Sequence, residues 1–495
     1  MHVSAARQIA FDILHRVAAE GAYASELLFT RLGPKVSRAD AGLATELTLG
    51  VLRWQGLLDF LLARHLHRQS EREDFESTIE RLDLEVLLAL RLGLYQLRFL
   101  ERVPAHAAVG EAVELAKRSR KRSAAGLVNA VLRRIAGEAK ISGADLEKLL
   151  PPEASMSRRA AIRYSHPEWL VARWISRFGL ERTGQLLQAN NRPPPLSCAV
   201  LDPEDMAAVA ASVREKHTTR DAARLEGLPH PEEFPHKEKN AREAPPGRWL
   251  RSALTLGRGN AAALEAFRSG EISLQDEASQ MVAHLADARP GERVLDLCAA
   301  PGGKATLLAR AVGPTGSVIA GDLHQHRLRS MREQLARTKT SNVHLLALDA
   351  TQPLPFAGHF DRILVDAPCT GTGTLARNPE IRWRLTPGDL ESAHRRQVSM
   401  LRQPLELLPP RGRLVYATCS LEPEENEQVV EEVLGNISSS GATFRIANGR
   451  SALNRHLRET VPADALFGNG SDCFFRTFPP ETHTDGFFAA VIERD

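Results

Sequence analysis

The sequence predicts a protein in three parts: an all-helical bundle, a small α+β connector, and an α/β domain with a mostly parallel, doubly wound sheet. With 495 residues, the chain is too long for one ordinary hydrophobic core. Its first part has apolar residues at helical spacing and few Pro or Gly residues. From Gly270 onward, strand-like apolar runs alternate with helical patterns, which is the order of βα units.

Composition restricts the class of protein. Hydrophobic residues make up 43% of the chain and charged residues 25%, which is typical of a soluble globular protein. No apolar run reaches the roughly 18 residues of a membrane span, and the N-terminus has no signal-type apolar block. We therefore expect a cytoplasmic protein without membrane contact. Five cysteines without a CxxC pair predict reduced thiols.

Residues 1–142 are predicted to form the helical bundle. A first helix is predicted because apolar residues recur at the spacing of one helical face, namely Ala6, Ile9, Ala10, Ile13, Leu14 and Val17. Further helices are predicted over 44–66, 84–100, 107–117 and 124–135. The run Lys117–Arg122 holds five charges in six residues without an acid, and Arg133-Arg134 follows it. Such a run is either a solvated helix end or a contact to RNA phosphates, and the net charge of +3 does not decide between them.

The connector is predicted over 145–268. Ser165-His166-Pro167-Glu168 predicts a helix start with Ser165 as the N-cap, which makes His166 a structural residue. Leu196, Cys198 and Val200 alternate with small residues as in a strand, and 229–247 has the composition of an exposed loop.

The α/β domain is predicted over 269–495. Its expected strands, each bounded by turn signals or helical patterns, are Arg293–Leu297, Ser317–Gly321, Val343–Leu348, Arg362–Val365, Arg413–Ala417 and Phe487–Ile492.

A loop of small residues follows the first of these strands and predicts a cofactor site. Small residues let the backbone approach a ligand closely, and this loop lacks both the third glycine of a dinucleotide site and the P-loop pattern. Asp322 follows the second strand, where a carboxylate can bind ribose hydroxyls, and Asp349 follows the third, within reach of an adenine. Each acid alone could equally be a helix N-cap, but together they favour S-adenosyl-L-methionine. The loop residues are Cys298, Ala299, Ala300, Pro301, Gly302, Gly303 and Lys304.

Two cysteines end strands. The apolar run Ile363–Val365 leads into Asp366-Ala367-Pro368-Cys369, and Cys419 lies in Tyr416-Ala417-Thr418-Cys419-Ser420. Ligands bind at the carboxyl ends of strands in open α/β sheets, which makes Cys369 the first candidate nucleophile. A metal would need three or four ligands, and no further cysteine forms a motif with these two, so no metal is expected. The polar surroundings of both thiols argue against inert core cysteines.

Methylation of cytosine C5 is a reaction that needs a thiol. Thiolate addition to C6 makes C5 nucleophilic, an acid near N3 holds the charge that develops on the base, and a base must then take the C5 proton. One thiol and one acid suffice in principle, so the second thiol requires a separate role.

The motifs resemble known families. One resemblance is to the NusB-type RNA-binding helical domain, and it rests on the segments Ala6–Ala10, Arg91–Leu97 and Ala125–Arg133. A second resemblance is to the RNA cytosine-C5 methyltransferases, above all the bacterial RsmB (Fmu/Sun) rRNA enzymes, which carry a NusB-like domain. The motifs that carry it are, in this order, Cys298–Lys304, Asp366–Cys369 and Ala417–Ser420. The resemblance implies a Rossmann-like, S-adenosyl-L-methionine-dependent methyltransferase domain.

The resemblance also implies residue roles. Cys419 would be the covalent nucleophile, Cys369 would release the product, and Asp366 would hold cytosine N3. Asp366 would also line the cofactor pocket, together with Cys298–Lys304, Asp322 and Asp349.

The leading hypothesis is therefore methylation of C5 of a specific cytidine in 16S rRNA, free or in an early assembly intermediate. The target base must leave its stack, so an unpaired or flipped cytidine is expected. The alternatives are a tRNA or another RNA as substrate, or a non-catalytic RNA-binding assembly or antitermination factor. Simple binding would require neither the acids nor the thiols. Nothing in the sequence indicates an obligate oligomer, and we expect a monomer.

Overall fold

The computed structural model describes residues 3–33, 36–66, 75–139, 143–217, 247–256, 261, 264–437, 443–459, 463–467 and 473–495. The chain divides into two compact units, which are described separately. Of the described residues, the first unit holds those up to Pro193 together with Leu375–Arg384, and the second holds the remainder.

The first unit is all-helical, as predicted. Its helices are α1 (Ala5–Glu20), α2 (Ala24–Arg31), α3 (Arg38–Leu66), α4 (Phe75–Glu80), α5 (Leu84–Phe99), α6 (Ala105–Arg118), α7 (Ala125–Ala136), α8 (Gly143–Leu149), α9 (Met156–Tyr164), α10 (Glu168–Asn190) and α16 (Ile381–Arg384).

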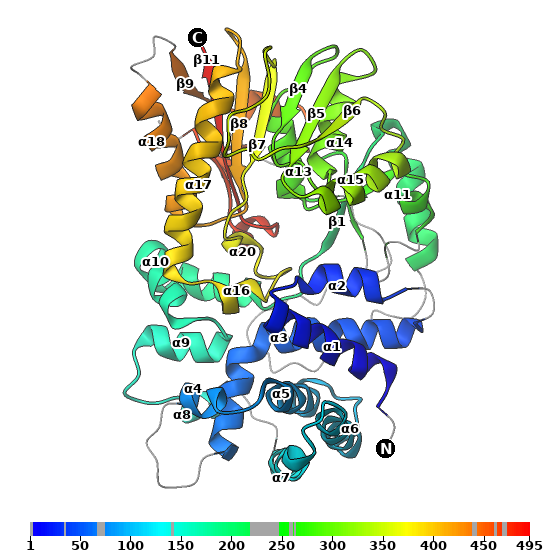
Figure 1. The fold of residues 1–495 in the computed structure, drawn as a ribbon, viewed down its shortest axis with the longest axis vertical. Helices are drawn as coiled ribbons and strands as arrows, with labels where there is room; N and C mark the ends of the chain where they lie inside the picture. The colour runs from blue at the N-terminus through cyan, green and yellow to red at the C-terminus, as the bar shows by residue number, and fades with distance from the viewer. Residues whose placement is uncertain are drawn as a thin grey trace. The chain divides into compact units, whose positions relative to one another are not determined.

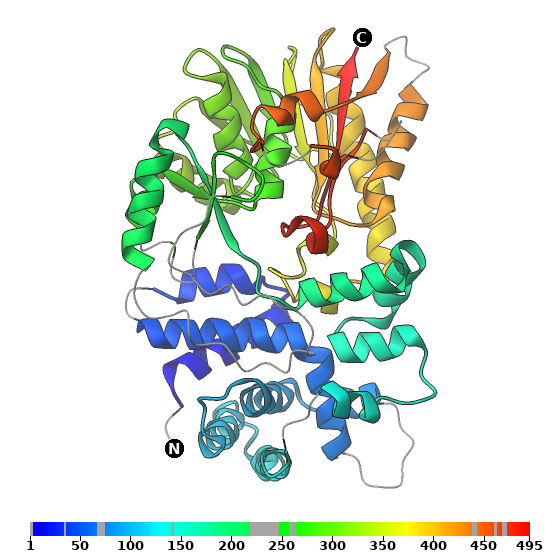
Figure 2. The same ribbon diagram turned by 180° about the vertical axis from the view of Figure 1, so that it is seen from behind.

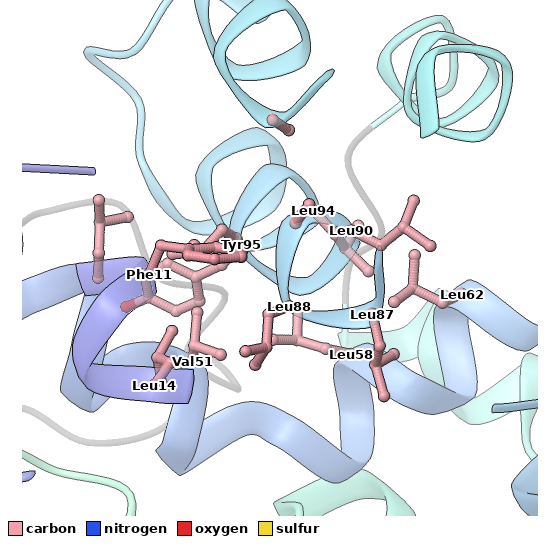
Figure 3. Packing of buried hydrophobic residues seen from close by; sticks show 14 of the residues in the cluster. Phe11, Leu14, Val51, Leu58, Leu62, Leu87, Leu88, Leu90, Leu94 and Tyr95 are labelled. Atoms are coloured by element: carbon pink, nitrogen blue, oxygen red, sulfur yellow. The ribbon is translucent and has the colours of Figure 1, made fainter. Parts of the chain in front are cut away.

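Helix α5 is the centre of this unit. Its residues are buried around most of its circumference, from Val86 to Gln96, which is typical of a helix enclosed by other helices. Figure 3 shows Leu87, Leu88 and Tyr95 of α5 packed against side chains of α1 and α3. The buried charge of Arg91 on α5 is compensated by two hydrogen bonds of 2.7 Å to Asp59.

The segment Leu375–Arg384 is the part of the first unit that comes from far along the chain. The guanidinium of Arg382 is fully buried and donates hydrogen bonds to the carbonyl oxygens of Arg53, Ser165, Asn190 and Leu375, at 3.0–3.3 Å, and to Asn191 Oδ1 at 2.9 Å. Trp383 Nε1 donates to the carbonyl oxygen of Leu52 at 2.6 Å. One arginine therefore connects α3, the turn between α9 and α10, and the end of α10.

One predicted helix start is wrong. Ser165 is not an N-cap: it follows the last residue of α9 with a φ of 56°, and α10 begins at Glu168 after Pro167. Its hydroxyl instead accepts a hydrogen bond from the backbone N–H of Gly56 at 2.9 Å, because the packing of α3 offers that donor. His166 is buried, and its Nδ1 pairs with the carbonyl oxygen of Tyr164 at 2.7 Å, which agrees with a structural role.

The second unit begins with a small antiparallel sheet. It has the strand order β2-β1-β3, with β1 at Leu196–Val200, β2 at Ala253–Leu256 and β3 at Ile272–Leu274. Helices α11 (Met206–His217) and α12 (Glu265–Arg268) accompany it, and Cys198, Leu254 and Ile272 share one core. The exposed loop predicted over 229–247 lies outside the described residues except for Gly247.

The large sheet has the order β10-β11-β8-β7-β4-β5-β6, with β9 paired to β11. Its four central pairings, which join the five strands from β8 to β6, are parallel, and the pairings of β11 are antiparallel. Figure 2 shows β11, in red, at the side of the sheet away from β6. The strands are β4 (Arg293–Asp296), β5 (Ser317–Asp322), β6 (Val343–Ala347), β7 (Arg362–Asp366), β8 (Arg413–Thr418), β9 (Phe444–Ala447), β10 (Phe475–Thr477) and β11 (Phe487–Arg494).

Helices cover both faces of this sheet, so the doubly wound prediction is confirmed (Figure 1). Successive residues of one strand face opposite sides: Val294 belongs to one core and Leu295 to the other. One face is covered by α13 (Glu277–Leu285), α14 (Gly303–Val312), α15 (Gln325–Arg337) and α19 (Arg450–Asn454), and the other by α17 (Pro387–Glu406) and α18 (Glu427–Ile437).

We predict that Arg382→Met destabilises the first unit. Methionine fills much of the space but leaves the carbonyl oxygens of Arg53, Ser165 and Asn190 without their donor, at about 1–3 kcal/mol each. The free energy of unfolding should therefore fall by about 3 kcal/mol or more. The free energy of unfolding can be measured by urea titration with tryptophan fluorescence as the signal. Four tryptophans lie in this unit, namely Trp54, Trp169, Trp174 and Trp383.

The matched control is Arg395→Met on α17, where the side chain is 65% exposed and pairs only with Glu391. It should leave the urea midpoint within error of the wild type. Equal effects of the two substitutions would contradict the role assigned to Arg382.

Candidate active site

The site lies where the direction of the sheet reverses. The chain runs outward from β4 to β5 and β6, then returns to β7, which pairs with β4 on its other side. In a doubly wound sheet the crevice at such a switch point receives the ligand. Asp296, Asp322, Asp366 and Thr418 are the last residues of β4, β5, β7 and β8, and all lie at the carboxyl edge of the parallel strands.

The loop Cys298–Lys304 follows β4 and leads into α14. Gly302 has a φ of 105°, a left-handed conformation that favours glycine, and its N–H donates to the carbonyl oxygen of Ala299 at 2.8 Å. The N–H of Ala299 in turn donates to the carbonyl oxygen of Gly321 at 2.8 Å, which fixes the loop to β5. The loop thus brings main chain, without bulky side chains, to the switch point.

Lys304 connects this loop to β7. Its ammonium lies 2.7 Å from Asp366 Oδ2, and both groups are largely buried. Burial alone would lower the pKa of Lys304, but the carboxylate of Asp366 outweighs it and leaves that pKa raised. The predicted cofactor lysine and the predicted base-binding acid therefore form one ion pair.

Asp296 was missed by sequence reasoning. It is fully buried, and neither of its carboxylate oxygens has a hydrogen-bond partner. Burial raises its pKa to about 8, and the nearby charge of Asp366 adds to the shift. The signal available in the sequence was its position: an acid at the last residue of β4, just before the glycine loop.

Two unpartnered oxygens on a buried acid call for a cationic donor. The α-ammonium of S-adenosyl-L-methionine is such a group, and the open main chain of the loop leaves room for the rest of its methionine part. The residues present at the switch point therefore fit the predicted cofactor.

Asp322 and Asp349 both make local turns. Asp322 is buried, accepts a hydrogen bond from the N–H of His324 at 3.0 Å, and pairs with Arg327 at 3.1 Å. Asp349 accepts from the N–H and the hydroxyl of Thr351, which lowers its pKa. No helix follows Asp349 directly, so it is not a helix N-cap. The contacts of both acids to ribose and adenine stay predictions.

The two thiols are neighbours. Cys369 Sγ and Cys419 Sγ lie 3.3 Å apart, although 50 residues separate them. The N–H of Gly373 donates to the carbonyl oxygen of Cys419 at 3.0 Å, which ties the loop after β7 to the end of β8. The hydrogen bond to Cys419 and burial raise the pKa of Cys369 well above its ordinary value. The two sulfurs share one hydrogen bond, in which either thiol can be the donor.

The loop after β7 also contacts Gly486, which directly precedes β11. The N–H of Gly486 donates to the carbonyl oxygen of Gly373 at 2.8 Å, and a Cβ on Gly373 would lie 2.1 Å from the carbonyl oxygen of Gly486. Only glycine fits at position 373. In the described ranges, no cluster of three or more His, Cys, Asp or Glu side chains could hold a metal ion.

The basic run of the first unit is partly neutralised. Lys121 pairs with Asp83 at 3.0 Å, and Lys117 and Arg118 lie within 3.9 Å of Glu114. Arg120 and Arg122 remain exposed. Glu114 lies on the same helix as Lys117 and Arg118, whereas Asp83 precedes α5 and meets Lys121 only in three dimensions. A hollow nearby is lined mostly by basic side chains, namely His15, Arg16, Arg31, Arg118 and Arg120, with Asp12 and Glu85 as its acids.

Comparisons with known proteins agree with this architecture. Family models match the NusB family over residues 4–137, an RsmF/B-like ferredoxin-like domain over 166–200, and 16S rRNA methyltransferase RsmB/F over 283–493. A probable ribosomal RNA small subunit methyltransferase B of Bacillus subtilis is 33% identical over 437 residues, which cover 87% of this chain and 88% of that protein. The chain belongs to the RsmB/F family of rRNA methyltransferases.

Solved structures show the same fold. The crystal structure of PH0851 covers 100% of this chain and 99% of its own, with a TM-score of 0.75 and 22% identity. NSun6 from Pyrococcus horikoshii, solved with the S-adenosylmethionine analogue SFG, covers 66% of this chain and 98% of its own, with a TM-score of 0.52 and 21% identity.

Family membership confirms the predicted cofactor, S-adenosyl-L-methionine, and rRNA as the class of substrate. None of the helices in the described part of the RsmB/F chain has the length and apolar character to span a membrane.

We predict that Asp296→Asn makes the cofactor-free protein more stable at high pH. An unfolded aspartate has a pKa of about 4, whereas that of folded Asp296 is about 8. The folded protein binds the proton more tightly, so the free energy of unfolding falls as pH rises through this window. Asparagine cannot ionise and avoids this fall. Thermal unfolding from pH 5 to pH 8 should show a stability difference that grows with pH, and a constant difference would contradict the assignment.

The same variant should bind S-adenosyl-L-methionine about tenfold or more weakly, because a charged hydrogen bond contributes about 1.5–3 kcal/mol. Calorimetry at pH 8, where wild-type Asp296 is half ionised before binding, measures this change.

Proposed function

We propose that the protein transfers a methyl group from S-adenosyl-L-methionine to C5 of a cytidine in 16S rRNA through a covalent bond between Cys419 and C6. The observation that carries this proposal is the pair of thiols 3.3 Å apart at the ends of β7 and β8, beside the ion pair of Lys304 and Asp366. Binding of RNA alone would need none of these groups.

The order of events follows from the chemistry of the base. The Cys419 thiolate adds to C6, and the electron pair released toward C5 makes that carbon nucleophilic. The cofactor supplies the methyl group that C5 takes up. A base then removes the C5 proton, and the electrons of the C5–H bond expel Cys419 as a thiolate.

Asp366 and Lys304 are placed to hold the base while charge develops on it. Asp366 ends β7 four residues before Thr370 and keeps Oδ1 available while Oδ2 contacts Lys304. A carboxyl group at this strand end can bind cytosine N3 and the exocyclic amine, which distinguishes cytosine from uracil. The buried ion pair supports this through electrostatic interactions that water would weaken.

Cys369 is assigned to release. Its raised pKa keeps it protonated, so it does not compete with Cys419 for addition to C6. It lies against the sulfur that is bonded to C6 during the reaction, which is next to the carbon that must lose its proton. Cys419 attacks C6, and its sulfur then no longer carries the charge that helps to keep Cys369 protonated. Cys369 can now give its proton to water and, as a thiolate, take the C5 proton, while the electrons of the C5–H bond expel Cys419 as a thiolate.

The relatives support rRNA rather than tRNA as the substrate. The matching Bacillus subtilis protein is described as a small subunit rRNA methyltransferase, and the family model names 16S rRNA. The exposed arginines of the first unit, with the NusB match over residues 4–137, support RNA contact there. Bisulfite mapping of methylated cytosines in rRNA from a deletion strain tests substrate and position together.

The two cysteines should fail in different ways when replaced. Cys419→Ala should abolish methylation and form no adduct, because C6 finds no nucleophile. Cys369→Ala should accumulate a covalent protein–RNA species, seen as a slow band on a denaturing gel. Cys473→Ser, which removes a cysteine outside these motifs, is the matched control and should methylate normally. Normal methylation by Cys419→Ala would contradict the proposal.

The arginines of the hollow should contribute to RNA affinity. Arg118→Ala with Arg120→Ala should weaken binding at low salt and reduce the slope of log K against log salt by about 0.7–0.9 for each lost phosphate contact. Filter binding from 50 to 300 mM KCl measures the slope. Lys148→Ala on α8, whose side chain is 77% exposed, is the control. An unchanged slope in the double variant would remove the hollow from the RNA contact.

A further inference from the structure

Glu425 is a buried acid that the proposed mechanism leaves without a role. It ends the short helix Pro423–Glu425, between β8 and α18, and its side chain has no solvent exposure. Burial raises its pKa, as expected for a carboxylate removed from water. A buried acid is unfavourable unless several donors compensate it, so its partners indicate what it is for.

The partners of Glu425 belong to both thiol loops. Its Oε1 accepts hydrogen bonds from the backbone N–H of Thr370, at 2.8 Å, and from Gln397 Nε2, at 3.2 Å. Its Oε2 accepts from the hydroxyl of Thr370 and from that of Ser420, the latter at 2.5 Å. Thr370 directly follows Cys369 and Ser420 directly follows Cys419. One carboxylate therefore holds the residue next to each thiol.

Glu425 itself is held in place by the elements around it. The hydroxyl of Tyr416 on β8 donates to its carbonyl oxygen at 2.6 Å. The amide of Asn426 donates to the carbonyl oxygen of Ser420 at 3.0 Å and accepts from Thr418 at 2.5 Å. Gln397 of α17 also donates to the carbonyl oxygen of Pro368 at 3.0 Å. The carboxylate is thus a fixed point between β8, α17 and the loop after β7.

We propose that Glu425 is a positioning residue that keeps Cys369 Sγ in contact with Cys419 Sγ during the reaction. The inference rests on the proposed function, in which one thiol carries the base and the other releases it. Release needs Cys369 beside the C5 proton, and C5 is bonded to the carbon that Cys419 holds. Loss of the connection between the loops would let Cys369 turn away while Cys419 could still add to C6.

Two substitutions separate the geometry from the charge. In Glu425→Gln, the amide oxygen can keep the bonds from the Thr370 N–H and Gln397, and the amide nitrogen can donate to the two hydroxyls, which rotate to accept. In Glu425→Ala, all four donors lose their acceptor. If positioning is the role, glutamine should preserve function and alanine should not.

The first measurement reads thiol geometry without any methylation. Diamide oxidises two neighbouring thiols to a disulfide, and the two hydrogen atoms reduce its azo group to a hydrazine. Peptide mass mapping gives the rate at which the Cys369–Cys419 bond forms. Wild type and Glu425→Gln should form the disulfide at similar rates. Glu425→Ala should form it at least about tenfold more slowly, because a misplacement of about 1 Å strongly slows an intramolecular reaction.

The second measurement reads catalysis. Glu425→Ala should lower kcat about 100-fold with little change in the KM for S-adenosyl-L-methionine, and should accumulate the protein–RNA adduct. Glu425→Gln should restore kcat to near the wild-type value. Glu431→Ala, which removes an exposed acid on α18, is the matched control and should behave as the wild type in both measurements.

If Glu425→Ala fails to fold by circular dichroism, Thr370→Val takes its place, since it removes one hydroxyl link and keeps the backbone N–H. Disulfide formation as fast as in the wild type, in whichever of these two variants folds, would overturn the inference. The proposed function would fail separately, through normal methylation by Cys419→Ala, and that result would leave the diamide rates unaffected.

Discussion

The parallel pairing of β4 with β7 is the constraint on which the site depends. Because β5 and β6 extend the sheet on one side of β4, and β7 and β8 on the other, the loops that follow β4 and β7 must diverge from a shared edge. The loop Cys298–Lys304 and the carboxylate of Asp366 both lie at that edge, where Lys304 and Asp366 form an ion pair. The parallel pairing of β7 with β8 then places Cys419, which directly follows β8, beside the loop after β7.

Charge burial explains why this edge is reactive rather than merely well packed. Asp296, Lys304, Asp366 and Glu425 are all removed from water to a large extent, and only some of them are compensated within the protein. Lys304 and Asp366 neutralise each other, and Glu425 receives four hydrogen bonds. Asp296 receives none. Such a group favours a cationic ligand, and this is why we predict that Asp296 faces the ammonium end of the cofactor.

The sequence was sufficient for the parts that rest on local patterns. Six of the eight strands of the large sheet were predicted to within two residues at each end, because buried strands are short apolar runs ended by turn residues. The short strands β9 and β10 were not predicted. The small-residue loop and the two thiols were singled out for the same reason, since each directly follows a strand. Their mutual distance of 3.3 Å was not predictable from spacing alone, because it depends on the pairing of β7 with β8.

What the sequence could not give are contacts between distant segments. Ser165 has the local features of an N-cap, but its hydroxyl is bound to the backbone of α3. The run Lys117–Arg122 has no acid within it, yet Asp83 at the start of α5 pairs with Lys121. Arg382 appears between two catalytic-domain elements in the sequence, but its acceptors belong to the helical unit. In each case tertiary packing overrode a correct local pattern.

The two thiols show how identical groups acquire different roles at 3.3 Å. A pair this close shares its protons, so a small difference in surroundings decides which sulfur carries the negative charge. The ammonium of Lys304 interacts electrostatically with Cys419, whereas the carboxylate of Glu425 acts on Cys369 and raises its pKa further. A positive group therefore lies near one sulfur and a negative group near the other. The acid that we propose holds the two thiols together therefore also adds to the difference between their surroundings.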